Sequence, residues 1–120
     1  MARRKILLKR VYEAPSDDDG LRILFERLWP RGVSKANAKI DHWRKDVSPS
    51  PAVRSWYGHR LERWEEFKRR YRAELKEKSL VVDELTELCA GKKVSFVFAT
   101  KDAEHSSAIL LRDFLLEKAK

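Results

Sequence analysis

Charged and hydrogen-bonding side chains gather in three stretches of the chain, residues 27–35, 46–54 and 100–105. Arginine and lysine make charge-assisted hydrogen bonds with anions, and the free amides at the starts of helices attract the same groups. This chemistry suits a phosphate-bearing small molecule, a nucleotide or the backbone of a nucleic acid. The candidate ligand-binding residues are Arg27, Trp29, Arg31, Lys35, Ser48, Ser50, Arg54, His59 and Lys101.

A second hypothesis makes the chain a small enzyme that acts on a phosphorylated or nucleotide substrate. Histidine titrates near neutral pH, so His59 and His105 have the chemistry of a general acid and base. A nucleophilic pair of His105 with Ser106 or Ser107 is disfavoured, because adjacent residues on one helix rarely point at each other. No complete catalytic signature is present, so the choice between binding and catalysis stays open. The candidate catalytic residues are His105, Asp102, Lys101 and Asp46, with Arg27 and Arg31 as substrate-binding partners.

A third reading gives Arg27 and Arg31 a purely structural role, in which they bind Asp46, Asp102 or backbone carbonyls and hold the loops together. Arg31 lies between a proline and a glycine. Its guanidinium therefore leaves a rigid turn, and it suits bidentate contact with a carboxylate as well as with a phosphate.

The sequence predicts no metal site and no cofactor. Its single cysteine, Cys89, excludes an internal disulfide and a multi-cysteine zinc site, and it is typical of a reducing compartment. The three histidines, His42, His59 and His105, have spacings that match no recognised ligand pattern. Cys89 falls on the apolar face of a predicted helix, which favours a buried thiol over a nucleophile.

The charge composition has two explanations. Charged residues make up 38% of the chain, against about 25% in ordinary proteins, while glutamine is absent and asparagine occurs once. Heat adaptation accounts for the total, but the net charge of +8 favours contact with a phosphate-rich partner. Arg69, Arg72 and Lys76 form a basic stripe on a predicted helix, which suits either nucleic-acid phosphates or a salt-bridged solvent face.

The N-terminal apolar run covers only residues 6–8, which is too short for a signal peptide or a membrane span. We therefore expect a cytoplasmic protein with no membrane association. Its length of 120 residues predicts one domain over residues 1–120.

Hydrophobic periodicity predicts an α/β fold with a small, mainly parallel sheet and helices on both faces. The segment after Val94 is almost continuously apolar, as expected of a central strand that is covered twice. Predicted strands are Lys5–Val11, Arg22–Leu28 and Val94–Ala99, with a further extended segment at Ile40–Val47. Predicted helices are a short turn at Ser34–Asn37, a helix from Pro51 that Gly58 ends, Leu61–Lys78, Leu80–Cys89, and a last helix capped by Asp102.

Parallel strands bring their carboxyl ends to one edge of a sheet, so the three charged stretches should meet there. We expect the Arg22–Leu28 and Val94–Ala99 strands to be neighbours or near neighbours. We also expect one polar cluster, which consists of Arg27, Arg31, Lys101, Asp102 and His105.

Five motifs occur in order along nearly the whole chain: RILFERLWPRGVSK (22–35), WRKDVSPS (43–50), WYGH (56–59), RWEEFKRRYRAEL (63–75) and TKDAEH (100–105). Together they closely resemble the short, YeaO-like branch of the Domain of Unknown Function 488 family. The resemblance implies an α/β domain and brings no established activity. Longer relatives often carry Cys-His-Arg at the start of the last helix, where this chain has His105-Ser106-Ser107, so cysteine chemistry there would be missing. The family also often has Asp-Pro where this chain has Arg60-Leu61, which puts the cap of the long helix in doubt.

Overall fold

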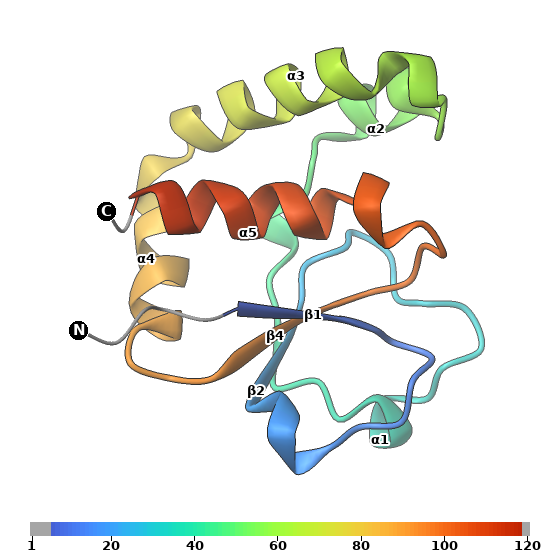
Figure 1. The fold of residues 1–120 in the computed structure, drawn as a ribbon, viewed down its shortest axis with the longest axis vertical. Helices are drawn as coiled ribbons and strands as arrows, with labels where there is room; N and C mark the ends of the chain where they lie inside the picture. Colours follow the sequence, from blue (N-terminus) through green and yellow to red (C-terminus); the bar gives the residue numbers. More distant parts are fainter. Residues whose placement is uncertain (1–5, 119–120) are drawn as a thin grey trace.

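The structure is a computed structural model that describes residues 6–118, so the predicted start of the first strand at Lys5 lies outside the described part. Four parallel strands form the sheet in the order β1-β4-β2-β3. In the central strand β4, Phe96 lies opposite Leu8 of β1 and Ile23 of β2 (Figure 1). This arrangement confirms the parallel sheet and the predicted neighbours. The strands are β1 (Ile6–Arg10), β2 (Leu21–Leu24), β3 (His42–Trp43) and β4 (Val94–Phe98).

Two of the predicted extended segments end several residues earlier in the structure. The strand predicted over Arg22–Leu28 ends at Leu24, where its pairing with β3 also ends. Beyond that point the Trp43 indole donates a hydrogen bond of 2.7 Å to the Glu26 carbonyl, so a side chain replaces the ladder. The extended segment predicted at Ile40–Val47 keeps only β3, and its remainder forms a 3₁₀ turn over Lys45–Val47.

Serine caps start the first two helices, as the sequence predicts. The Ser34 hydroxyl accepts from the Asn37 amide, and the Ser50 hydroxyl accepts from the Val53 amide. The long helix instead follows a 3₁₀ turn at Leu61–Arg63 that has no side-chain cap, at the position where the family's Asp-Pro is absent. The helices are α1 (Lys35–Ala38), α2 (Pro51–Tyr57), α3 (Trp64–Glu77), α4 (Ser79–Cys89) and α5 (Ser107–Lys118).

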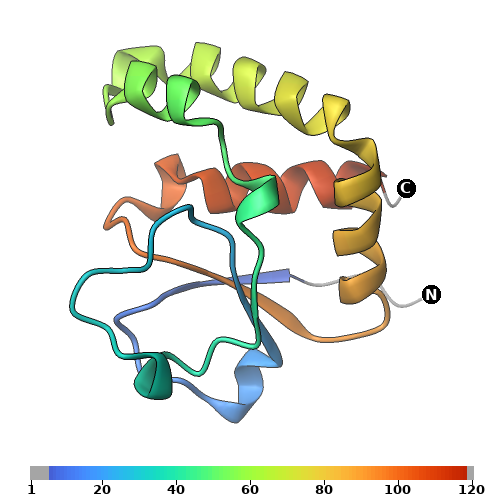
Figure 2. The same cartoon turned by 180° about the vertical axis from the view of Figure 1, so that it is seen from behind.

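Helices cover both faces of the sheet, but unequally. The long helices lie on one face, where α5 lies between the sheet and α3 (Figures 1 and 2). Their apolar side chains, such as Tyr71 and Leu111, form one core with Phe96 of β4. On the other face, the part of the chain that the structure describes covers the strands only with the four-residue α1 and adjoining loops, through a small cluster of Val11, Ala38 and Val97.

The second face also holds a buried ionic network. Asp19 lies in a 3₁₀ turn just before β2, and its carboxylate binds Arg22 at 2.6 Å and Lys9 at 2.9 Å. The Ser95 hydroxyl of β4 donates to the Asp19 carbonyl at 2.8 Å. Arg22 also donates to the Ala38 carbonyl of α1 at 2.9 Å. One turn therefore connects three strands and the helix that covers them.

Among residues 6–118, no helix has the length and the apolar character needed to cross a membrane.

Candidate functional site

A cavity of about 600 Å³ opens at the carboxyl ends of β2 and β4. After β4 the chain passes to α5 on one face of the sheet, whereas after β2 it passes to α1 on the other face. Ligands of open parallel sheets bind in the crevice that such a divergence creates. The polar lining consists of Glu26, Arg27, Ser48, Arg54, Ser55, Tyr57, His59, Thr100, His105, Ser106 and Ser107.

Local structure fixes the β2 side of the cavity. The Trp43 indole donates a hydrogen bond to the Glu26 carbonyl. The Trp43 ring packs against Trp29, with ring centroids 5.3 Å apart. The Lys45 ammonium lies over the Trp43 ring, 3.9 Å from its centroid. Glu26 and Arg27 therefore leave the sheet from a braced segment.

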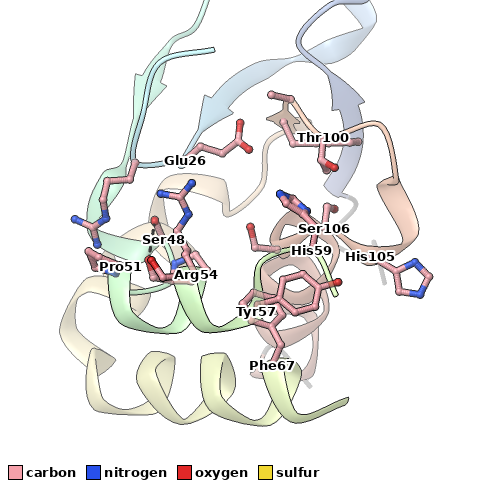
Figure 3. Close-up of a pocket in the computed structure, with 16 residues that line it drawn as sticks. Glu26, Ser48, Pro51, Arg54, Tyr57, His59, Phe67, Thr100, His105 and Ser106 are labelled. Atoms are coloured by element: carbon pink, nitrogen blue, oxygen red, sulfur yellow. Dashed lines mark hydrogen bonds between the residues drawn. The ribbon is translucent and has the colours of Figure 1, made fainter. Parts of the chain in front are cut away.

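The α2 side of the cavity has its own support. Ser50 caps the helix with its hydroxyl, and its backbone amide donates to the Glu74 carboxylate of α3 at 3.0 Å. Arg54 follows one turn later and extends toward Glu26 in Figure 3. Ser48 and Arg54 line the cavity, whereas Ser50 serves the helix start.

Glu26 and Arg27 each present a buried polar atom, Oε1 and Nε respectively, that has no hydrogen-bond partner among residues 6–118. Burial raises the pKa of Glu26 above its ordinary 4.5, and the Ala99 amide and the Arg54 charge oppose that rise without cancelling it. Buried polar atoms are paired in most folded proteins, so unpaired atoms at a cavity point to a missing partner.

The two cavity histidines differ in orientation. His59 has a left-handed backbone, with φ of 58°, and its ring lies 6.0 Å from that of Tyr57. The His105 ring packs on Trp64 at 5.0 Å, its Nδ1 lies 2.8 Å from the Asp102 carboxylate, and Figure 3 shows it turned away from the cavity. The predicted cap at Asp102 is wrong, because this carboxylate makes no capping hydrogen bond and contacts His105 instead.

Tyr57 also lines the cavity, and the pKa of its phenol is shifted. Burial raises the pKa of Tyr57, and the Asp102 carboxylate raises it further. The Tyr57 hydroxyl therefore stays protonated well into the alkaline range and remains a hydrogen-bond donor.

Four predicted binding residues and one predicted catalytic residue line the cavity, and the others lie elsewhere. Trp29 and Lys35 cover the second face of the sheet, where the Trp29 indole donates to the Val33 carbonyl at 2.6 Å. Arg31 and Lys101 are exposed and do not line the cavity. Asp46 pairs with Arg44 at 3.0 Å, also outside it. The five that the structure brings together are Arg27, Ser48, Arg54, His59 and His105.

Glu26 is the site residue that sequence reasoning missed. It falls inside the segment Arg22–Leu28, which is predicted as a buried strand. Glu26 is the one acidic residue of that segment, and this was the available signal, because a buried carboxylate needs a partner. Thr100 and Tyr57 carried no comparable signal.

The cavity offers an anion two arginines, hydroxyl groups and the amides around the start of α5. Within the described residues, no group of three or more His, Cys, Asp or Glu is placed to hold a metal ion. The Cys89 thiol lies fully buried in the core on α4, away from the cavity lining.

Glu26→Gln is expected to raise the free energy of unfolding at neutral pH by about 1 kcal/mol, because it removes a poorly solvated carboxylate. Because the folded-state pKa of Glu26 is raised, its protonated form contributes its full stabilisation below the ordinary pKa of 4.5. That stabilisation is lost as the pH rises through the folded-state pKa. The gain should therefore shrink below pH 4.5. Urea unfolding at neutral pH and below pH 4.5 measures the gain in the free energy of unfolding. An equal gain under both conditions would contradict the proposed cause.

Comparison with known proteins gives consistent results. The sequence profile of a family described as "Inactive DUF488-N3 subclade" (DUF488-N3i) matches residues 5–120. The chain is 40% identical over 111 residues to the uncharacterized protein Rv3073c of Mycobacterium tuberculosis, covering 92% of this chain and 93% of the relative. It is 31% identical over 110 residues to the uncharacterized protein YeaO of Escherichia coli, covering 92% and 96%. No solved structure shows significant similarity.

Proposed function

The chain belongs to the DUF488-N3i family, described as the inactive DUF488-N3 subclade, and we propose that it binds a small phosphate-bearing ligand in the cavity without transforming it. The observation that carries the proposal is the unpaired, buried Arg27 Nε at a cavity that Arg54 also lines. A guanidinium donor that is shielded from water loses solvation, and a phosphate oxygen restores the lost hydrogen bond.

The surface charge supports a cavity ligand over a nucleic-acid backbone. On α3, Arg69 is paired with Glu66, and Arg72 makes two hydrogen bonds to Glu117, at 2.8 and 3.1 Å. Carboxylates thus already neutralise two of the three side chains in the basic stripe. A phosphate backbone would have to compete with these partners, whereas the arginine donor at the cavity is unoccupied.

The positions of two reactive groups, the His105 ring and the Cys89 thiol, support binding over catalysis. A nucleophile or a general acid must reach the bound group within hydrogen-bond distance. The His105 ring is turned toward Trp64 and Asp102, and the Cys89 thiol is in the core. The word "inactive" in the family's description agrees with this reading.

Arg27→Gln and Arg54→Gln are each expected to weaken the binding of 5′-AMP and inorganic phosphate by about ten- to a hundredfold, because each removes charge-assisted hydrogen bonds worth about 1.5–3 kcal/mol. Isothermal titration measures the dissociation constants.

Arg31→Gln is the matched control, because it removes the same charge from an exposed loop outside the cavity. Its affinity should stay within about twofold of the parent. An equal loss in this control, or no binding of either probe by the parent protein, would refute the cavity as the phosphate site. Tighter binding of single-stranded DNA that weakens steeply with salt would favour the nucleic-acid alternative.

A further inference from the structure

We propose that the ligand of this cavity carries an amino group as well as a phosphate, and that the Glu26 carboxylate binds the amino group. The inference rests on the proposed function and extends it to a class of ligand. Glu26 lines the cavity beside Arg27 and near Arg54, so one site presents a carboxyl group as well as two guanidinium cations.

The two oxygens of Glu26 have different surroundings. The Ala99 backbone interacts with the carboxyl group, whereas Oε1 is buried and has no partner among the described residues. Arg54 acts on the group only through its charge, with no hydrogen bond between the two side chains. The protein thus leaves one acceptor unfilled although an arginine lies nearby.

A phosphate alone leaves this acceptor unexplained. A phosphate held by Arg27 and Arg54 brings further negative charge toward Glu26, and like charges in a partly buried site repel each other. An ammonium or amino group on the same ligand reverses the sign of that interaction and supplies the missing donor. Burial also makes such a charged hydrogen bond stronger than it would be in water.

Binding of an amino phosphate should also change the protonation of the Glu26 carboxyl group. Because burial raises the pKa of Glu26, this group holds its proton to a higher pH than an exposed glutamate does. An ammonium group beside it favours the ionised form. Binding of an amino phosphate should therefore release protons in the pH range where the unliganded group is protonated.

The test compares 2-aminoethyl phosphate and 3-aminopropyl phosphate with ethyl and propyl phosphate, by titration against the intact protein. In the parent, at least one amino compound should bind about tenfold or more tightly than the alkyl compound of equal length. In Glu26→Gln this preference should fall to about twofold or less, while the alkyl phosphates keep or improve their affinity.

Glu104→Gln is the control, because it removes an exposed acid from the turn before α5. This variant should retain the preference for the amino compounds. Equal binding of amino and alkyl phosphates by the parent, or an unchanged preference in Glu26→Gln, would overturn this inference and leave phosphate binding standing. Failure of all four compounds to bind would overturn the proposed function as well.

Discussion

Asp19→Ala is expected to lower the free energy of unfolding by about 3–5 kcal/mol, because it leaves a buried guanidinium without its counter-charge. The side chains of Asp19 and Arg22 are 6% and 4% exposed, so water cannot replace the lost partner. The change also removes the acceptor of Lys9 and of the Ser16 backbone amide. Urea unfolding at neutral pH measures the loss.

Asp18→Ala is the control, since it removes an exposed carboxylate from the same 3₁₀ turn. Its effect should stay within about 0.5 kcal/mol. Comparable losses in the two variants would mean that the turn, and not the ionic network, provides the stability.

The same network should make stability depend on acid. Burial by itself raises the pKa of Asp19, but hydrogen bonds from Lys9, the Ser16 backbone and Arg22 outweigh it and hold the pKa below its usual 3.8. For a lowered pKa, the stabilisation is complete above the unfolded-state value and is lost as pH falls through the folded-state value. The parent should therefore lose this contribution below pH 3.8, and Asp19→Ala should lack that step.

Gly20→Ala is expected to destabilise the protein by more than about 3 kcal/mol, or to prevent folding, because it combines backbone strain with a backbone clash. Gly20 has φ of 65° and ψ of −139°, a conformation open almost only to glycine. An added Cβ atom would lie 2.1 Å from the Lys93 carbonyl oxygen and 2.6 Å from its carbon. That carbonyl accepts the Leu21 amide at 2.9 Å, so it cannot move without disturbing the start of the β2–β4 pairing.

Gly91→Ala separates the two causes. Gly91 also has positive φ, at 69°, but no atom lies within 4 Å of an added Cβ there. Only the conformational penalty of about 1 kcal/mol should appear. Thermal unfolding of both variants distinguishes them, and equal losses would show that the close approach of Lys93 has no energetic consequence.

The sequence predicts best those elements whose secondary structure follows from their own pattern of apolar residues. In α3, apolar residues three and four apart, such as Phe67, Tyr71 and Leu75, are all buried in the core. The nearly continuous apolar run of β4 likewise marks a strand buried on both faces. The end of β2 was mispredicted because it depends on β3, a two-residue strand whose length no local pattern indicates.

The site was harder to predict, because it depends on where loops turn after the sheet. Arg27 and His105 both reach the cavity lining, as expected from parallel strands. Arg31 lies only four residues beyond Arg27 and is nevertheless outside, since the chain has turned toward the second face by then. The buried ionic partners of Asp19 could not be predicted either. An acidic turn at the surface and an acidic turn buried under a loop have the same sequence pattern.

The strand order has a consequence for the growing polypeptide. Among residues 6–118, β4 is the last strand, but it occupies the middle of the sheet and is the only neighbour of β1. Ile6 therefore cannot pair until Val94 has been synthesised, so β1 stays without this partner while residues 11–93 are made. Contacts between such distant segments slow folding and leave apolar surface exposed in the meantime. For this chain, the time taken to translate the residues between β1 and β4 therefore determines how long the apolar side chains of β1 are most exposed to aggregation.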